Sequence, residues 1–79
     1  MEPEEAFGLV LRELRTKHGL SQEALAHEAG VERNYISLLE LGRNSASIKI
    51  IFKLTPVLGV TVSEFMRKIE AKLRQAQDS

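Results

Sequence analysis

A short polar run in the middle of the chain holds side chains of the types that hydrogen-bond to the edges of DNA bases. It starts at Glu32 and ends at Ser37. Arginine can donate two parallel hydrogen bonds to guanine, asparagine can bond in the same way to adenine, and a carboxylate can accept from cytosine. The run follows Gly30, and apolar residues on both sides of that glycine recur at helical spacing. We therefore expect two short helices within residues 22–40, the second of which turns outward Glu32, Arg33, Asn34 and Ser37.

Two helices should precede and support this polar run, which makes the helix that carries it the third of the chain. The first helix is expected from about Pro3 to Lys17, because proline suits the first helical turn, where its missing N–H is not needed. One apolar stripe at the spacing i, i+3, i+4, i+7 predicts its buried face. The second helix should start at Ser21, a favourable N-cap residue. The third, which carries the polar run, should extend from about Glu32 to Leu41. The stripe of the first helix consists of Phe7, Val10, Leu11 and Leu14.

After a polar loop, the fourth helix is expected over about Ser47 to Leu58. Pro56 lacks a backbone donor and crowds the preceding turn, so a kink or an early end is predicted near Thr55. The next helix should begin with a capping box formed by Thr61 and Glu64. The residues of the fourth helix that are expected to point inward are Ile48, Ile51, Leu54 and Leu58.

The last helix, over residues 62–77, carries apolar residues at spacings of four and three, as helices in lateral contact do. Its first turn must pack on the domain, because Phe65 belongs to the core. The later residues are expected to run past the core and, since exposed apolar rows usually mark contact surfaces, to form a homodimer interface. The other interpretation is a frayed tail, because residues 75–79 are polar. The predicted interface consists of Ile69, Leu73 and Ala76.

Length and composition narrow the class of protein. Seventy-nine residues make one domain with a small core, which a second subunit would help to stabilise. There is no cysteine, so disulfides and thiolate metal sites are excluded. No apolar run approaches about 20 residues and the N-terminal stretch is acidic, so we expect a soluble cytoplasmic protein without a membrane partner.

The net charge is zero, whereas dedicated nucleic-acid binders usually have a basic excess. Residues 31–60 nevertheless carry four basic residues against two acidic ones, which gives modest support to a polyanionic partner. Lys49 and Lys53 could add to a phosphate clamp or could simply be solvated. The four basic residues are Arg33, Arg43, Lys49 and Lys53.

The segment SQEALAHEAGVERNYISLLELGRN combines Gln, Ala, Gly-Val, Ile, Glu and Gly at one characteristic set of spacings. On these residues the chain resembles the Xre-type (phage-repressor/Cro) helix-turn-helix family over about residues 7–66. Among its members it is most similar to the small controller proteins of restriction–modification systems. The resemblance implies an all-α fold, one lambda-repressor-like domain of five helices over residues 1–79 with an extended C-terminal helix. It also implies a sequence-specific DNA-binding transcription regulator that acts as a homodimer on a roughly palindromic operator.

The resemblance further implies two sets of DNA contacts. Residues at the exposed start of the reading helix contact bases, whereas the start of the preceding helix and the loop after the reading helix contact the DNA backbone. A tyrosine hydroxyl in the same helix can also bond to a phosphate. The expected partners are double-stranded DNA and a second copy of the chain, with no cofactor and no small-molecule ligand. The implied base contacts are Arg33, Asn34, Ser37 and Glu32, and the backbone contacts are Gln22, Tyr35, Arg43, Asn44 and Ser47.

Several of these residues also have a simpler interpretation. Arg33 could be a solvated arginine that pairs with Glu32 or Glu40. Asn34 could hold a phosphate as readily as it could read adenine. Glu32 is favourable at a helix N-terminus whether or not it meets a base. Tyr35 could serve only to pack against its own helix.

No catalytic pattern is evident in the sequence. His27 follows Glu23 by one helical turn, but neither this pair nor His18 has an evident third metal ligand. A nucleophile beside a general base is likewise not apparent, so we do not expect an enzyme or a metal site. The alternative function is an antitoxin-like protein-interaction module with the same fold. It is indicated by the zero net charge and by the apolar Leu38 and Leu41 on the reading helix.

Overall fold

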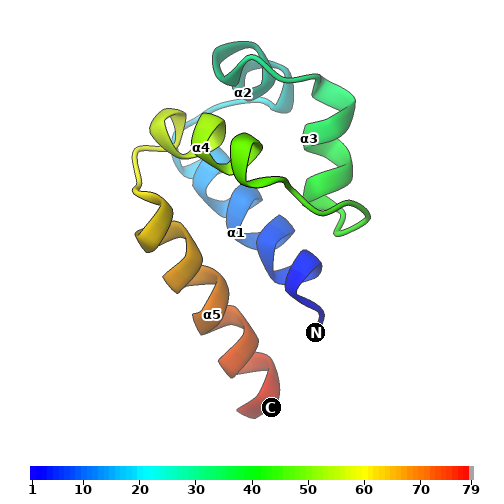
Figure 1. The fold of residues 1–79 in the computed structure, drawn as a ribbon, viewed down its shortest axis with the longest axis vertical. Coiled ribbons are helices and arrows are strands. Elements are labelled where there is room, and N and C mark those ends of the chain that lie inside the picture. The colour runs from blue at the N-terminus through cyan, green and yellow to red at the C-terminus, as the bar shows by residue number, and fades with distance from the viewer. Residues whose placement is uncertain (79) are drawn as a thin grey trace.

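Five helices and no strand make up residues 1–78, the part of the chain that the computed structural model describes (Figure 1). The predicted all-α, five-helix fold is confirmed. Each predicted helix is present, and its ends lie within a few residues of the expected positions. The helices are α1 (Pro3–Lys17), α2 (Gln22–Ala29), α3 (Arg33–Glu40), α4 (Ile48–Val57) and α5 (Val62–Asp78). No helix among these residues is long and apolar enough to cross a bilayer.

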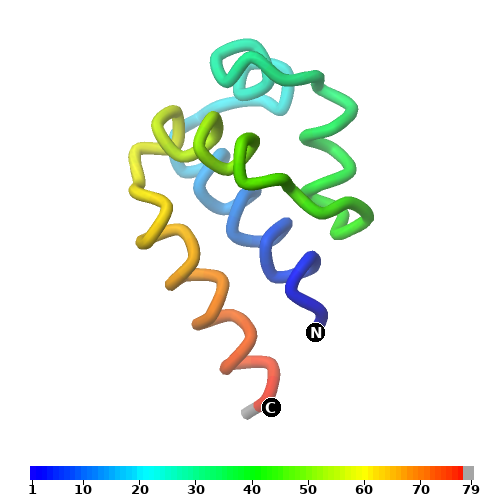
Figure 2. The backbone as a smooth tube through the Cα atoms, viewed as in Figure 1, coloured from blue at the N-terminus to red at the C-terminus, as the bar shows by residue number. Residues whose placement is uncertain are grey.

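The first helix, α1, is the central support of the domain. It contacts both α3 and α5, and Figures 1 and 2 show it between these two helices. The remaining contacts join α2 to α3 and α4, and α4 to α5. At the centre the rings of Phe7 and Phe65 meet edge to face, with centroids 5.0 Å apart. The side chains that are almost fully buried come from all five helices: Val10, Leu11, Leu25, Ile36, Leu39, Leu54, Leu58 and Phe65.

Local hydrogen bonds help to fix where α1, α2, α4 and α5 begin, as the sequence predicted for α2 and α5. The Ser21 hydroxyl accepts from the backbone N–H of Ala24 at 3.0 Å. At the start of α5, the N–H of Glu64 donates to the Thr61 hydroxyl (3.0 Å) and the N–H of Thr61 donates to the Glu64 carboxylate (2.8 Å). Hydrogen bonding to Thr61 lowers the pKa of Glu64, and the bond from the backbone N–H of Thr61 contributes most. In α4, Ser47 has the capping role that Ser21 has in α2.

The structure corrects two expectations about α4. Ile48 was predicted to point inward, but 73% of its surface is exposed. The helix buries Leu54 and Thr55 instead, and Ile48 lies about a third of a turn away from Leu54 around the axis. Of the two outcomes predicted for Pro56, a kink or an early end near Thr55, the early end is not observed, because α4 continues through Pro56 to Val57. The N–H of Leu58, two residues after the proline, donates to the carbonyl of Leu54 at 3.1 Å, as in a regular helix.

A third correction concerns α5. Ile69 was expected to run past the core, but only 5% of it is exposed and it belongs to the core cluster. Leu73 packs against the same cluster, and Ala76 is half-buried. The reason is that α5 lies along α1, where Lys72 forms an ion pair with Glu13 at 2.5 Å. The apolar stripe of α5 therefore serves packing within the chain over most of its length.

Candidate nucleic-acid interface

The start of α3 presents its polar residues to solvent. Glu32, Arg33 and Asn34 are exposed, and Ser37, one turn later, is half-buried. The opposite side of the helix carries Ile36 and Leu39, which are fully buried against the rest of the domain. This arrangement follows from the 3.6-residue period of the helix, which puts Arg33, Asn34 and Ser37 on the side away from Ile36 and Leu39. Arg33, Asn34 and Ser37 thus lie on one outer face of α3, whereas Glu32, the N-cap residue, precedes the helix and lines a hollow with Tyr35 and Lys53.

Arg33 is free to meet a ligand. Within residues 1–77, its guanidinium takes part in none of the ion pairs or side-chain hydrogen bonds. The alternative in which Arg33 pairs with Glu40 does not apply, because Glu40 is occupied elsewhere. Glu32, the N-cap residue of α3, likewise makes no side-chain capping bond.

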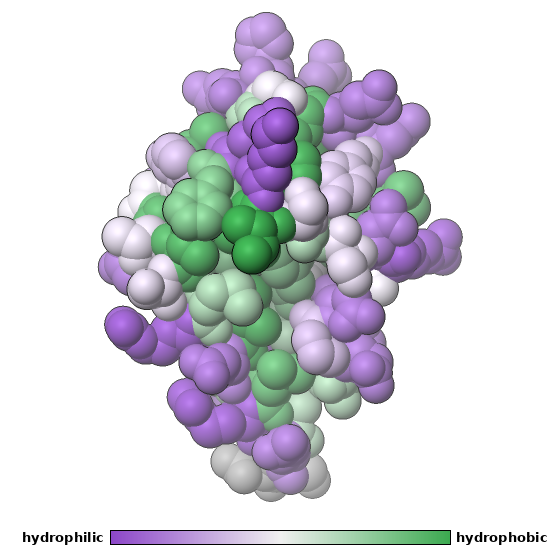
Figure 3. All heavy atoms as spheres, in the orientation of Figure 1, coloured by the Kyte–Doolittle hydropathy of each residue, from purple (hydrophilic) through white to green (hydrophobic). Residues whose placement is uncertain are grey.

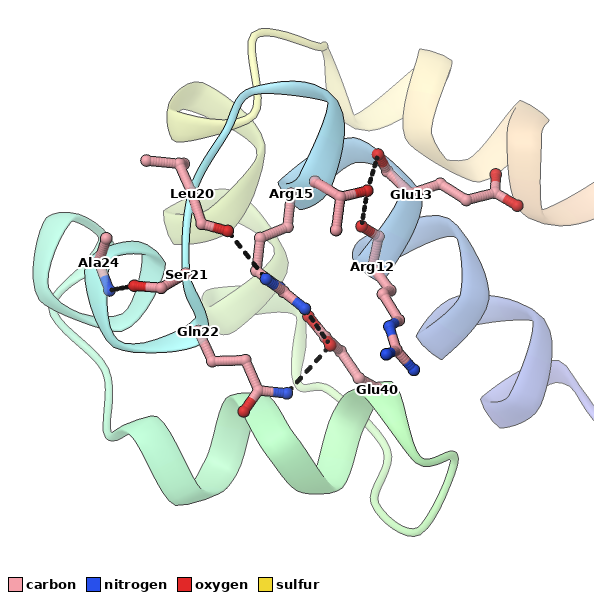
Figure 4. A network of polar contacts seen from close by, with 9 residues as sticks. Arg12, Glu13, Arg15, Leu20, Ser21, Gln22, Ala24 and Glu40 are labelled. Carbon is pink, nitrogen blue, oxygen red and sulfur yellow. Dashed lines mark hydrogen bonds and ion pairs between the residues drawn. The ribbon is translucent and has the colours of Figure 1, made fainter.

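Glu40 and Arg15 form a buried ion pair behind the outer surface of α3 (Figure 4). The Nε of Arg15 donates to one carboxylate oxygen of Glu40 at 2.6 Å, and Nη2 donates to the other at 2.9 Å. Only 11% of the Arg15 side chain and 3% of the Glu40 side chain are exposed. The hydrogen bonds to Glu40 raise the pKa of Arg15, which stays charged. A third bond, from Nη1 to the carbonyl of Leu20 at 2.8 Å, ties the pair to the loop before α2.

This pair was not predicted from the sequence. The only local sign of the pair is that the charged residue Glu40 stands between two leucines, Leu39 and Leu41. Its partner lies 25 residues away in α1. The ion pair closes one end of α3 against α1, so that the helix is held at a fixed angle to the domain.

Gln22, a predicted backbone contact, is attached to the same pair. Its Nε2 donates to Glu40 Oε1 at 3.0 Å (Figure 4). A glutamine amide has two N–H groups and one carbonyl oxygen, so one donor remains for a phosphate. Gln22 is half-buried and lies at the first position of α2. Its position is therefore set by Glu40 before any ligand arrives.

Tyr35 holds the loop that follows α3. Its hydroxyl donates to the backbone carbonyl of Ser45 at 3.1 Å, and its half-buried ring packs against the core. The hydroxyl proton is thus engaged within the chain, which favours the packing interpretation over a free phosphate donor. Arg43 and Asn44, in the loop that this bond restrains, are both exposed. The Ser47 hydroxyl accepts from the N–H of Ile50 at 3.2 Å and keeps its own hydrogen for donation.

The exposed charge of residues 31–60 is mostly positive although the whole chain is neutral. Of the two acidic residues within residues 31–60, Glu40 is buried with Arg15, so only Glu32 contributes negative charge at the surface. All four basic residues of the segment are exposed. Lys53, on α4, lines a shallow hollow together with Glu32 and Tyr35, so its side chain borders the start of α3.

His18 and His27 are not part of a metal site in the part of the chain that the structure describes, where no three His, Asp or Glu side chains gather closely enough to hold an ion. His18 ends α1, and its ring lies over Gly59. His27 is an exposed residue of α2.

Comparisons with known proteins agree with this geometry. A helix-turn-helix family model matches residues 11–65. The chain belongs to this family. Among relatives, control protein C.MunI of Mycoplasma sp is 38% identical over 65 residues, which cover 81% of this chain and 88% of that protein. This match confirms the resemblance to Xre-type controller proteins that the sequence indicated.

Two solved structures of regulatory proteins are similar to this chain over most of its length. The restriction–modification controller protein C.AhdI from Aeromonas hydrophila matches with a TM-score of 0.76 and 42% sequence identity, over 78% of this chain and 94% of that one. The clp gene regulator ClgR from Corynebacterium glutamicum matches with a TM-score of 0.88 and 29% identity, over 99% and 85% of the two chains. The second match includes α5, so the long final helix is shared with a known regulator.

Proposed function

We propose that this helix-turn-helix chain is a sequence-specific DNA-binding transcription regulator that acts as a homodimer on a roughly palindromic operator. The observation that carries the proposal is the outer face of α3. There Arg33 and Asn34 are exposed without partners of their own chain, on a helix that is anchored from behind by the core and by Glu40. The major groove of DNA, about 12 Å wide, admits such a helix. The helix-turn-helix family and its named regulators support the same function.

The side chains divide into two roles in this proposal. Arg33 would donate two hydrogen bonds to guanine and Asn34 would contact adenine or a phosphate, with Ser37 and Glu32 beside them. Phosphates would be held on both sides of the groove, because α2 and the loop after α3 flank the reading helix. Tyr35 would act indirectly, by keeping that loop in place. The phosphate contacts are Gln22, Arg43, Asn44 and Ser47.

A homodimer supplies the second reading helix that a palindromic site needs. Half-sites of such operators lie about 34–36 Å apart, one turn of DNA. One copy of this chain measures 36 × 23 × 23 Å, so two copies side by side can present their α3 helices at that separation. A single α3 of eight residues reaches few bases, and a second copy doubles the length of sequence that is read.

The proposal is tested by selection of bound duplexes from a random DNA pool, with the molar mass of the free protein measured in parallel. We expect one enriched, roughly palindromic motif and a dimer mass. Recovery of no enriched motif at low salt would contradict the proposal and favour the protein-interaction alternative. An enriched single half-site together with a monomer mass would contradict only the homodimer and leave the DNA-binding part of the proposal standing.

The role of Arg33 is tested on the selected operator. Arg33→Ala should reduce discrimination against a changed base pair by about 1–3 kcal/mol, since a bidentate contact to guanine is worth that much. Arg74→Ala is the matched control, because it removes the same charge from an exposed position on α5, far along the chain from α3. Discrimination that survives Arg33→Ala unchanged would show that another residue reads the sequence.

A further inference from the structure

Two leucines lie on the side of α3 that is turned away from the core. Leu41 is 58% exposed, and Leu38, one turn earlier, is half-buried. Around the helix axis they lie about 170° and about 130° from the midpoint of the two buried residues, Ile36 and Leu39. A single exposed apolar residue is ordinary, whereas two on the face that the proposed function assigns to DNA indicate a contact.

The direction of Leu41 is set by the way in which α3 ends. Leu41 is the C-cap residue, but its backbone keeps helical angles (φ −82°, ψ −4°) and its N–H donates to the carbonyl of Ser37 at 3.1 Å. The next residue, Gly42, lies against α1, because a Cβ atom there would be 3.1 Å from the Cα of Glu5. The last turn of α3 is therefore held from behind by α1, while the Leu41 side chain faces solvent.

The two leucines share this face with polar residues that are proposed to bind DNA. Asn34 lies about 20° from Leu41 around the axis, and Ser37 stands between them along the helix. Arg43 is exposed just beyond the end of α3. Figure 3 shows mostly hydrophilic residues on the side of the molecule where α3 lies, with a small hydrophobic area among them. DNA that binds to this face must therefore bring a group of its own against the leucines.

The edges of the bases offer one apolar group in the major groove, the C5-methyl group of thymine. The other groups on these edges are hydrogen-bond donors and acceptors, and a leucine that covered them would leave them unpaired. 5-Methylcytosine presents a methyl group at the same ring position. Leu38 and Leu41 can enclose such a group from two sides, since residues three apart on a helix have their Cβ atoms about 5–6 Å apart.

We propose that Leu38 and Leu41 form a binding site for the C5-methyl group of a pyrimidine in the major groove. The inference rests on the proposed function, and it assigns the two leucines to DNA instead of a protein partner. Along the helix axis they lie about 7.5 Å and about 12 Å from Arg33. Successive bases of a strand are about 3.4 Å apart, so the methyl group should belong to a base pair about two to four steps from the one that Arg33 contacts.

Uracil isolates the contribution of the methyl group. It differs from thymine only by the missing C5-methyl and keeps the O4 acceptor, so a polar contact to the same base would not distinguish the two. Burial of one methyl-sized group should lower the dissociation constant about fourfold, which corresponds to about 0.8 kcal/mol. A contact of the leucines with the sugar or the phosphate would show no such dependence.

The test measures binding of the full chain to its selected operator after uracil replaces each thymine in turn. For the wild type, replacement at one position of a half-site should raise the dissociation constant about fourfold. The double variant Leu38→Ala/Leu41→Ala should bind the thymine and uracil duplexes almost equally. Leu9→Ala is the matched control and should respond as the wild type does, since Leu9 is 40% exposed but lies on α1.

A second series separates the two sources of a C5-methyl group. Here 5-methylcytosine replaces each cytosine of the operator in turn. If uracil has no effect at any position, but one methylated cytosine strengthens binding of the wild type about fourfold and not that of the double variant, the site holds 5-methylcytosine. Circular dichroism and thermal melting show whether the variants fold. Should the double variant fail to fold, Leu41→Ala decides, because its side chain is mostly exposed and it should reduce the fourfold effect.

The outcomes separate this inference from the proposed function. If an operator is enriched but neither loss nor gain of a C5-methyl group alters the affinity of the wild type, the methyl site is wrong and sequence reading by Arg33 stands. An equal response of the wild type and the double variant would also overturn the inference, since another residue would then hold the methyl group. If no operator is enriched, the proposed function is wrong and the inference falls with it.

Discussion

The carboxylate of Glu40 joins three parts of the domain through hydrogen bonds from two other elements. It accepts from Arg15 on α1 and from Gln22 at the start of α2, and it is itself the last residue of α3. Loss of these donors would leave the Glu40 side chain, only 3% exposed, without its partners, which is far more costly than the loss of a surface ion pair. The orientation of the reading helix and the position of one phosphate donor thus depend on the same side chain.

Arg15→Met should therefore destabilise the protein by about 3–5 kcal/mol, because it leaves the Glu40 carboxylate buried and unpaired. Urea unfolding followed by circular dichroism measures this change. Lys72→Met is the matched control, since it breaks the more exposed pair with Glu13 and should cost no more than about 1 kcal/mol. The double variant Arg15→Met/Glu40→Leu should recover much of the loss. If the double variant is as unstable as Arg15→Met, the cost arises from lost packing of the arginine.

The sequence could predict the exposed residues of α3 but not this pair. Arg33 and Asn34 follow from helical period and from the family resemblance, both of which are local in the sequence. The contact between Arg15 and Glu40 spans 25 residues and exists only because α1 crosses α3 at that point. The partner of Tyr35 was missed for the same reason, since the carbonyl of Ser45 reaches the hydroxyl only once the loop is folded back.

Among the elements, the crossing of α1 over α3 determines how closely the reading helix is held. It is made possible by Gly8, which lies in the middle of α1 and is buried. A Cβ atom at this position would lie 2.5 Å from the carbonyl oxygen of Leu39 and 2.6 Å from that of Glu40. Real Cβ atoms do not approach backbone oxygens so closely, and neither backbone can give way without moving a whole helix. The two helices therefore touch through their main chains.

Gly8→Ala should destabilise the protein by about 1–3 kcal/mol, the usual cost of overpacking a core. The sign of the change in the free energy of unfolding is informative, because alanine in a helix interior is otherwise favoured over glycine by about 1 kcal/mol. Thermal unfolding of the variant measures it. Arg12→Ala, at an exposed position on the same helix, is the control for altered helix propensity. A more stable Gly8→Ala variant would mean that α1 and α3 are further apart than described.

The positions of the helices could be predicted well because their ends are set by neighbours in the sequence, such as Ser21 and the Thr61–Glu64 capping box. What could not be predicted is how far each apolar stripe is covered. Ile48 was expected to be buried and is exposed, whereas Ile69 was expected to be exposed and is buried. Periodicity defines the face of a helix, but the length and angle of its neighbours decide how much of that face lies in the core.

For the whole molecule, the distribution of charge matters more than its sum. The burial of Glu40 with Arg15 removes one acidic residue from the surface that faces the proposed DNA, and Lys53 approaches the start of α3 from α4. Acidic residues elsewhere, such as those of the first turn of α1, offset these charges in the total. A neutral chain can in this way present basic residues where the proposed DNA would lie.

The strength of this basic face is measurable as salt dependence. The logarithm of DNA affinity falls with the logarithm of salt concentration by about 0.9 for each phosphate that is neutralised. In a dimer, Lys53→Ala removes one cation from each subunit, so the slope should become less steep by about two, with the preferred sequence unchanged. Lys68→Ala is the matched control, because it removes an exposed lysine from α5, and it should leave the slope as it is. A slope that Lys53→Ala does not alter would show that the Lys53 ammonium group does not reach the DNA backbone, and the phosphate contacts would then rest on the loop with Arg43.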